Sequence, residues 1–428
     1  MKVDIVLCYE IWQRELQALT ALRCELEKRG YKVKMLHRNP RVDRYFEAYL
    51  YSPKVVYFPW VYSESDLEKA RDFKGNCNKI LNAQCEQILG KRAEQTGFFK
   101  VKGEARKVYH VCWGEKSYQR FIDCGIKEDH ILKVGNINLE INKKKYDKFY
   151  LSKEQIAKQF SLDRNKKWML FCSNFKFVKS HYADLIGLEK RSPGIISLAQ
   201  ESKKARELIL QWFTQYLSEH NDVEIIYRPH PMEKYDRELE KLQKNISSFH
   251  YISDYSINQW SRVVDLFTTW GSTSIMDAIY INRKSAYIMP ERMPEIIRGD
   301  ADNVCPHIYK YEDFSDFLNG NTDTAKLSLD GLIYKNIDSI NTLANYIELI
   351  YKSKVDFKLD SKLTRYKKWI KLRVLDQFNL FMYWIAKSIK IYKLYKTKST
   401  YYNLYFEAYE SKKMEKNIYY KMRKITNV

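Results

Sequence analysis

The sequence lacks the features that would assign it to several large classes of protein. Its eight cysteines are scattered along 428 residues, with no C-x-x-C pair and no Cys/His cluster at the spacing of a zinc site. Isolated thiols of this kind are typical of a reducing compartment. No apolar run approaches the roughly 20 residues of a membrane-spanning helix. The short apolar stretch at the N-terminus, interrupted by Asp4, predicts a first strand rather than a signal peptide. We therefore expect a cytoplasmic protein.

Three common fingerprints are also missing. The sequence has no G-x-x-x-x-G-K-[ST] phosphate loop, no G-x-G-x-x-G dinucleotide turn and no G-x-S-x-G nucleophile elbow. Hydrophobic residues nevertheless make up 45% of the chain and charged residues 30%, which excludes global disorder and allows large buried cores.

The positive charge is concentrated at the C-terminal end. The chain has a net charge of +21, and residues 362–428 hold 17 Lys and Arg against four acidic residues, or +13 of that total. Residues 369–395 mix these cations with apolar and aromatic side chains, among them Phe378, Phe381 and Trp384, as in a helix that lies in a membrane surface. We expect the tail, 356–428, to bind an anionic membrane surface at the inner face of the cell membrane. The alternative is a solvated helical appendage or an oligomerisation arm.

The length and the hydrophobic pattern predict two α/β domains. The chain is too long for one ordinary domain, and short apolar runs alternate with helical patterns, which is typical of parallel sheets. We expect an N-terminal Rossmann-like domain over 1–137, a linker over 138–166 and a second Rossmann-like domain over 167–355. The predicted strands lie at 3–8, 32–36, 55–60, 108–113 and 131–134, and then at 168–172, 223–227, 263–268 and 285–288.

The most informative segment is Arg228-Pro229-His230-Pro231, directly after the predicted strand 223–227. Ligands of open α/β folds bind at the carboxyl edge of the sheet, where this segment would lie. The two prolines fix the backbone, so the guanidinium and the imidazole are held before a ligand arrives. Arg228 can bind phosphate oxygens, and His230 can donate to a leaving phosphate. The alternative is a rigid turn with a stacked histidine.

A second segment, Trp270-Gly271-Ser272-Thr273-Ser274, connects the predicted strand 263–268 to a helix. Gly271 lets the backbone approach a ligand, and the hydroxyls and the helix N-terminus can bind phosphate, although helix capping alone would also explain them. A third strand exit, at Ser173 and Asn174, offers polar groups at the same edge.

These motifs carry a family resemblance. A two-domain α/β chain with His-Pro and a Gly-Ser-Thr-Ser turn in its second half resembles a GT-B-fold glycosyltransferase, in which a central cleft separates the domains. More narrowly, it is similar to bacterial surface-carbohydrate enzymes, the sialyl-, polysialyl- and Kdo-transferases, which share an HP motif and a Ser-Ser/Thr motif. The resemblance covers about residues 1–355. The segment 10–15, Trp113-Gly114 and Gly135-Asn136 are similar to uncharacterised surface-polysaccharide glycosyltransferases.

The resemblance implies the substrates. It assigns the nucleotide phosphate of a CMP-linked acidic sugar, such as Kdo or a nonulosonic acid, to His230-Pro231 and Ser272-Thr273, extended to Ser274. The acceptor would be a surface polysaccharide or a lipid-linked glycan, of capsule or lipopolysaccharide type. The Arg-Pro-His-Pro form also resembles CDP-glycerol polyol-phosphate transferases of teichoic-acid synthesis, which is the competing interpretation.

The catalytic base is less clear from the sequence. The sialyltransferase families take it from an Asp/Glu-Asp/Glu-Gly motif, and this chain has no convincing copy. An inverting transfer still needs a group that accepts the acceptor's hydroxyl proton. The resemblance places that group in the N-terminal domain, where Glu10 is the first candidate and Glu86 the second. Each could equally be a surface or helix-capping carboxylate, and a retaining enzyme would need no such base.

We expect no metal and no cofactor. Asp300-Ala301-Asp302 is formally a metal-binding D-x-D, but no predicted strand precedes it. Arg228, His230 and a helix N-terminus could neutralise the single phosphate of a CMP leaving group.

Two other functions fit parts of the sequence. The net charge alone would suggest nucleic-acid binding, but the charge lies mainly in the tail and the chain has no helix-turn-helix or aromatic RNA-binding signature, so we expect no nucleic-acid partner. A GT-B-fold epimerase acting on a nucleotide sugar would need neither an acceptor nor the tail.

Overall fold

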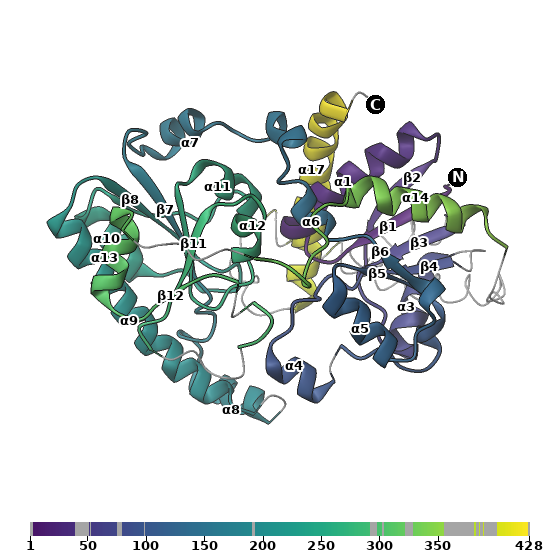
Figure 1. Cartoon of the computed structure of the whole chain (residues 1–428), viewed down its shortest axis with the longest axis horizontal. Helices are drawn as coiled ribbons and strands as arrows, with labels where there is room; N and C mark the ends of the chain where they lie inside the picture. Colours follow the sequence, from purple (N-terminus) through teal and green to yellow (C-terminus); the bar gives the residue numbers. More distant parts are fainter. Residues whose placement is uncertain are drawn as a thin grey trace. The chain divides into compact units, whose positions relative to one another are not determined.

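Two six-stranded sheets, each with all its strands parallel, organise the chain (Figure 1). The computed structural model describes residues 3–38, 51, 53–74, 79–97, 99–190, 193–291, 298–301, 304–321, 328–354, 381, 385, 388 and 400–426. Each sheet forms the centre of one compact unit. The prediction of two Rossmann-like α/β domains is confirmed by these two sheets.

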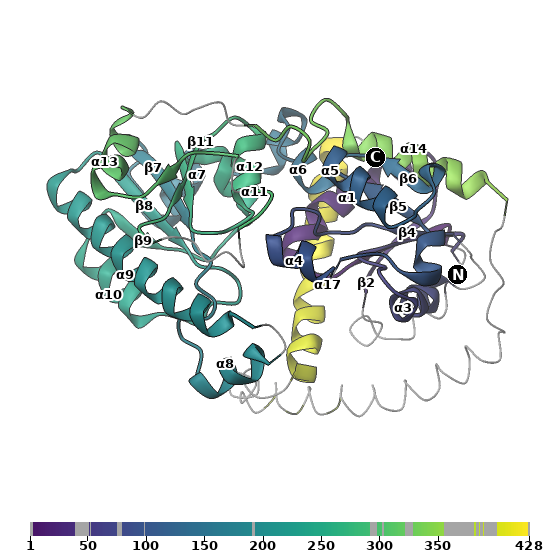
Figure 2. The same cartoon turned by 60° about the horizontal axis from the view of Figure 1, so that its bottom comes forward.

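The first unit is built on a sheet with the strand order β2-β1-β3-β4-β5-β6. Its strands are apolar and buried along almost their whole length, as expected where helices cover both faces of a parallel sheet. Helices α14 and α3 lie on opposite faces of this sheet (Figure 2). The elements are β1 (Ile5–Tyr9), α1 (Trp12–Lys28), β2 (Val33–His37), β3 (Val55–Phe58), α3 (Glu64–Lys74), β4 (Lys79–Asn82), η1 (Gly103–Lys107), β5 (Tyr109–Cys112), α5 (Glu115–Asp123), η2 (Glu128–His130), β6 (Ile131–Lys133), α6 (Ile137–Glu140), α14 (Ser339–Lys352) and α17 (Thr400–Thr426).

The second unit has the strand order β12-β11-β10-β7-β8-β9, so the chain starts at the central strand β7 and adds strands first on one side and then on the other. This is the doubly wound order of a dinucleotide-binding fold. The elements are α4 (Lys91–Thr96), η3 (Lys144–Phe149), α7 (Lys153–Phe160), β7 (Lys167–Cys172), α8 (Tyr182–Glu189), α9 (Ile195–Glu219), β8 (Val223–Arg228), α10 (Arg237–Asn245), β9 (Phe249–Tyr251), α11 (Ile257–Val263), β10 (Leu266–Thr269), α12 (Ile275–Tyr280), β11 (Lys284–Ile288), β12 (His307–Ile308) and α13 (Tyr311–Asn319).

The boundaries of the two units differ from the expected ones. Residues 88–98, between β4 and β5, belong to the second unit, which otherwise spans 142–330. The expected linker, 138–166, is ordered and contains α6, η3 and α7. The chain returns to the first unit from residue 331, so α14 packs against α1 rather than completing the second unit.

Two glycines of the predicted motifs allow this returning segment to pack. A Cβ on Gly114 would lie 2.3 Å from the backbone of Leu332, and the N–H of Tyr334 donates to the carbonyl of Trp113 at 2.7 Å. Gly135 has a φ of +82°, and a Cβ there would lie 2.6 Å from Ser339 Oγ. Trp113-Gly114 and Gly135-Asn136 therefore have a packing role in the first unit.

The last helix of the tail is part of the first unit. Helix α17, yellow in Figure 1, packs along α1. The hydroxyls of Ser411 and Tyr9 are 3.0 Å apart in a buried contact, and Arg23 lies over the Tyr419 ring at 3.9 Å from its centroid. Met422 is fully buried. Within the expected tail, 356–428, helix α17 is therefore a packing element of the first unit on one of its sides, and its membrane association stays a prediction.

Most of the segment 369–395 lies outside the described residues, so its predicted amphipathic helix stays a prediction. Of the helices in the part of the chain that the structure describes, none is both long enough and apolar enough to cross a membrane.

The close approach at Gly114 gives a stability prediction. Replacing Gly114 by Ala places a methyl group against the backbone of Leu332, and we expect it to lower the free energy of unfolding by about 1–3 kcal/mol. Chemical denaturation followed by tryptophan fluorescence measures this change. Gly187→Ala in α8 is the control, since a Cβ there meets nothing within 4 Å. A Gly114→Ala protein as stable as the wild type would contradict the packing role.

Candidate functional site

Three strand exits of the second unit lie side by side. Strand β7 pairs with β8 on one side and with β10 on the other, and the register aligns Cys172 with both Arg228 and Thr269. The segments that follow these residues carry the predicted motifs: Ser173-Asn174 after β7, Pro229-His230-Pro231 after β8, and Trp270 to Ser274 after β10. The structure therefore brings all the donor-site candidates to one edge, at the point where the strand order reverses.

Arg228 is half-buried, and none of the described carboxylates forms an ion pair with it, although Asp254 and Asp277 lie near enough to act on its charge. One guanidinium nitrogen donates to the carbonyl of Tyr255 at 2.8 Å, whereas Nε is buried and has no hydrogen-bond partner. Tyr255 adopts a φ of 65°, which is uncommon for a bulky side chain. Burial lowers the pKa of Arg228 from its usual value. Arg206 of the same unit, which is buried, is paired with Asp236 at 2.7 Å.

His230 is fixed in one tautomer by its own turn. Its Nδ1 accepts a hydrogen bond from the backbone N–H of Met232 at 3.1 Å, so the neutral ring carries its proton on Nε2. Burial lowers the pKa of the imidazole to about 4, and the charges of Lys176 and Arg228 act in the same direction. At neutral pH the side chain is therefore an uncharged N–H donor until an anion binds beside it.

Glu233, which we did not predict from the sequence, ties the β7 and β8 exits together. Its Oε1 accepts from Ser173 Oγ and from the N–H of Phe175, both at 2.7 Å, and from the N–H of His230 at 3.3 Å. Burial raises the pKa of this carboxyl group. Its place five residues after Arg228 could have drawn attention, but only the folded chain shows that it holds the His230 backbone.

Ser173 and Asn174 have a different role from the expected one. The Ser173 side chain is 2% exposed and contacts Glu233 and the Arg228 carbonyl, and Asn174 Nδ2 donates to the carbonyl of Gly271 at 2.8 Å. Both side chains connect neighbouring exits of the sheet. They are therefore suited to positioning the site, while Pro231 lies exposed on its surface.

The turn after β10 is compact and rich in hydroxyl groups. Gly271 has a φ of 65°, a conformation that favours glycine, and leads into Ser272. Ser272 Oγ accepts from the N–H of Ser274 at 3.3 Å and lies 2.9 Å from Ser274 Oγ. Thr273 is exposed. Helix α12 has only six residues, so the expected contribution of its N-terminus is limited.

A small pocket opens beside this turn, within the second unit. It is lined by Tyr287, by residues 271–273 of the turn, and by residues 88–90 and 299–301, two segments that form an antiparallel bridge between Gly90 and Gly299. Asp300 lines the pocket, and its Oδ2 accepts from the N–H of Leu89 at 2.9 Å. Asp302, the other half of the D-x-D, lies outside the described residues. Within the described ranges no three His, Cys, Asp or Glu side chains group as a metal site would require.

A buried carboxyl group lies behind the turn. Asp277 on α12 accepts hydrogen bonds from Asn142 Nδ2 at 3.2 Å and from Asn258 Nδ2 at 3.0 Å. Burial raises its pKa from 3.8 to about 7, against the effect of these two amides and of the Arg228 charge. The charge of Asp277, and with it the local field at Arg228, therefore changes near neutral pH.

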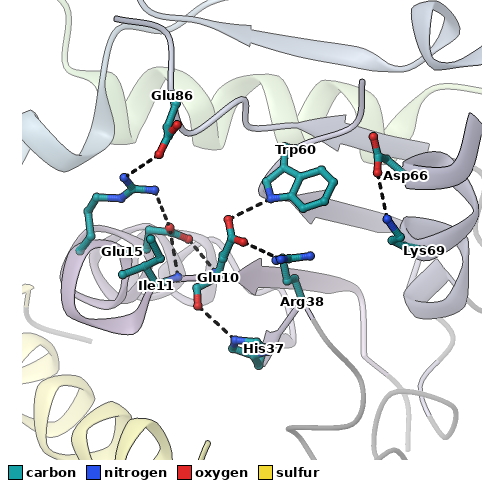
Figure 3. A network of polar contacts seen from close by, with 10 residues as sticks. Glu10, Ile11, Glu15, His37, Arg38, Trp60, Asp66, Lys69 and Glu86 are labelled. Atoms are coloured by element: carbon teal, nitrogen blue, oxygen red, sulfur yellow. Dashed lines mark hydrogen bonds and ion pairs between the residues drawn. The ribbon is translucent and has the colours of Figure 1, made fainter. Parts of the chain in front are cut away.

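In the first unit, the two candidate bases lie in one polar network at the carboxyl edge of the sheet (Figure 3). Both oxygens of Glu10 are engaged, Oε1 with Arg38 at 2.6 Å and Oε2 with the Trp60 indole N–H at 2.9 Å. Glu86 has one ion pair, with Arg14 at 3.3 Å, and its side chain is 53% exposed. Arg14 also contacts the buried Glu15. Glu86 therefore has the more accessible carboxylate.

Comparisons with known proteins give distant structural likenesses. No protein-family model matches the chain, and no curated protein matches it. A putative UDP-N-acetylglucosamine 2-epimerase from Listeria monocytogenes has a TM-score of 0.48 at 12% identity, over 84% of this chain and 100% of that one. The wall teichoic acid polymerase TagF gives 0.46 at 13% identity, over 88% and 90%. HepE from Anabaena, in complex with UDP-glucose, gives 0.41 at 11% identity, over 89% and 100%. All three scores are below 0.5, so the function is argued from this chain's own residues.

The raised pKa of Asp277 predicts a pH-dependent stability. Because the native state holds this proton more tightly than the unfolded chain, the wild type loses stability as the pH rises from about 4 to about 7. Asp277→Asn cannot ionise, so we expect its free energy of unfolding to rise relative to the wild type from pH 5 to pH 8, as measured by urea denaturation. The exposed Asp313→Asn on α13 controls for the loss of one negative charge. A constant difference between Asp277→Asn and the wild type across this pH range would show that Asp277 does not titrate in this way.

Proposed function

We propose that the chain is an enzyme that transfers a sugar or a polyol phosphate from a nucleotide-activated donor. The observation that carries this proposal is Arg228, a half-buried guanidinium with a buried, unpartnered Nε and no ion pair among the described residues. His230 and the hydroxyl turn 272–274 follow β8 and β10, the two strands that flank β7, at the same edge of the sheet. A buried cation that lacks an internal partner is costly, and a phosphate supplies the missing charge and acceptors.

In glycosyl transfer, the acceptor hydroxyl oxygen attacks the anomeric carbon of the donor. The bond from that carbon to the phosphate oxygen breaks, and its electron pair stays on the leaving nucleotide. Arg228 and the Nε2–H of His230 stabilise the charge that develops there, so no metal is required by this scheme. The hydroxyl proton passes to a carboxylate of the first unit. We place Glu86 before Glu10 for this role, since both oxygens of Glu10 already have partners.

Two donor classes fit the phosphate-binding residues. The motif resemblance favours a CMP-linked acidic sugar such as Kdo or a nonulosonic acid, and the Arg-Pro-His-Pro form fits a CDP-linked polyol, whose product would be a phosphodiester. The acceptor in either case is a bacterial surface polysaccharide or a lipid-linked glycan.

Peripheral membrane binding is part of the proposal, and the side of α17 that does not pack on α1 offers a specific surface for it. The side of α17 away from α1 exposes Lys413, Lys416 and Lys424 together with Tyr420, while Glu415 pairs with Arg23. An exposed row of cations with an aromatic side chain suits an anionic lipid surface. Because α17 covers part of α1, deleting the tail would also uncover the first unit.

The donor site predicts which variants lose nucleotide binding and turnover. A bound ligand at 100 times its Kd adds about 2.7 kcal/mol of stability, so we expect CMP or CDP to raise the melting temperature of the wild type more than UDP or GDP. Arg228→Ala should remove the shift, whereas the exposed Arg237→Ala should keep it. His230→Ala should lower turnover about 100-fold or more at unchanged stability.

The outcomes separate the parts of this proposal. A larger shift with UDP or GDP would change the donor base and leave the phosphate site in place. Equal shifts in the wild type and Arg228→Ala, or wild-type turnover in His230→Ala, would overturn the phosphate site. No shift with any nucleotide would overturn the proposed function.

The membrane surface is tested by charge reversal. We expect the wild type to co-sediment with vesicles of phosphatidylglycerol and phosphatidylcholine, and the triple variant Lys413→Glu, Lys416→Glu, Lys424→Glu to remain largely in the supernatant. Vesicles of phosphatidylcholine alone are the control for apolar binding. Equal sedimentation of both proteins with the anionic vesicles would assign membrane binding, if present, to another part of the chain.

A further inference from the structure

A fourth strand exit lies beside Arg228, on the side away from β7. Strand β9 pairs with β8, and the register aligns Tyr251 with Tyr227. The N–H of Ile252 then donates to the carbonyl of Tyr227 at 3.1 Å. Because parallel strands end at the same edge of a sheet, the segment that follows β9, residues 252–256, runs next to the chain that leaves β8 at Arg228.

Contacts with α7 and α11 fix the place of this segment. The indole N–H of Trp260, which is fully buried, donates to the carbonyl of Asp254 at 2.8 Å. The hydroxyl of Tyr255 donates to Gln159 Oε1 at 2.5 Å, and its ring meets the Phe160 ring edge to face, with 6.0 Å between the centroids. The segment is therefore held by groups of the second unit other than Arg228.

The backbone of Tyr255 is in the left-handed region. Its φ of 65° is rare for an aromatic residue, because the Cβ crowds the carbonyl group that follows it. Such conformations persist where the surrounding contacts impose them, and they concentrate at functional sites. The crowded carbonyl is the one that accepts from Arg228 Nη2 at 2.8 Å. The direction of this acceptor therefore depends on the unusual backbone conformation.

The acceptor is neutral, which matters for the charge of Arg228. The Asp236 carboxylate both orients and neutralises Arg206, whereas a carbonyl oxygen orients a guanidinium group without neutralising it. The Nε of Arg228 is buried and has no hydrogen-bond partner. Since no ion pair joins Arg228 to a carboxylate in the described part of the chain, the guanidinium group held by Tyr255 can still pair with an incoming anion.

We propose that Tyr255 is a positioning residue of the phosphate site: its left-handed backbone aims the carbonyl group at Arg228, and this holds the guanidinium group where it meets the nucleotide phosphate. The proposal rests on the proposed function, since it needs a phosphate at Arg228. The backbone conformation is required and the phenol ring is not. Glycine, which adopts a positive φ readily, can therefore replace the tyrosine in this role.

The test compares two variants that both remove the phenol ring, Tyr255→Val and Tyr255→Gly. Only valine disfavours the left-handed region, since its branched Cβ crowds the backbone further. Asn282→Val is the matched control, because Asn282 is exposed, has a φ of 58° and precedes β11, at the opposite edge of the sheet. The probe is whichever of CMP, CDP, UDP and GDP the full-length wild type binds most tightly, and isothermal titration calorimetry gives its Kd for each protein.

We expect Tyr255→Val to bind the probe about tenfold more weakly than Tyr255→Gly, which should stay within about threefold of the wild type. Asn282→Val should have a lower urea unfolding midpoint and keep the wild-type Kd. Equal Kd values for Tyr255→Val and Tyr255→Gly overturn the inference and leave the phosphate site standing, as does an equal loss of affinity in Asn282→Val.

A second measurement needs no nucleotide. The difference between the urea midpoints of Tyr255→Val and Tyr255→Gly should shrink when Arg228→Ala is added to both, because the carbonyl then has no guanidinium group to meet. An unchanged difference overturns the inference. If the wild type binds none of the four nucleotides, the proposed function falls and takes the positioning role with it, whatever the midpoints show.

Discussion

The pairing of β7 with β8 on one side and β10 on the other is the constraint on which the candidate site depends. Parallel strands in register end at one edge, so the chain that leaves each strand is delivered to the same place. Cys172 is aligned with both Arg228 and Thr269, and the three following segments share one edge. Arg228 and the turn 272–274 are separated by more than 40 residues of sequence. In the sheet, however, only β7 lies between β8, which ends at Arg228, and β10, which leads to the turn.

Side-chain hydrogen bonds also hold the segments that follow these three strands to one another. One oxygen of Glu233 holds the β7 exit and the backbone of His230, and Asn174 holds the carbonyl of Gly271. These polar groups of Glu233 and Asn174 form their hydrogen bonds within the protein. The Nε of Arg228 has no such partner, whereas Arg206 of the same unit is paired with Asp236. The proposed phosphate site therefore needs little rearrangement when an anion binds, because the side chains that position it already have their hydrogen bonds.

The sequence predicts most strands and both phosphate-site motifs because these depend on local pattern. It does not predict β4, because this short strand begins with Lys79 and ends with Asn82, both of which are polar. Lys79 is buried because its ammonium group donates to the carbonyl of Ile350 at 2.5 Å at the end of α14, a partner about 270 residues away. The docking of α17 is unpredictable for the same reason, since the contact of Ser411 with Tyr9 spans 402 residues. Glu233 is not predicted from the sequence because only the fold shows what its carboxylate holds.

The contacts of the two candidate carboxylates also bear on the choice of base. Both oxygens of Glu10 are engaged, one by Arg38 and the other by the Trp60 indole N–H. Glu86, which follows β4, forms an ion pair with Arg14, and its side chain is 53% exposed. A group that accepts a proton needs a carboxylate oxygen that a hydroxyl group can reach. The greater exposure of Glu86, and the engagement of both Glu10 oxygens, are therefore the physical reasons for placing Glu86 before Glu10 in the proposed transfer.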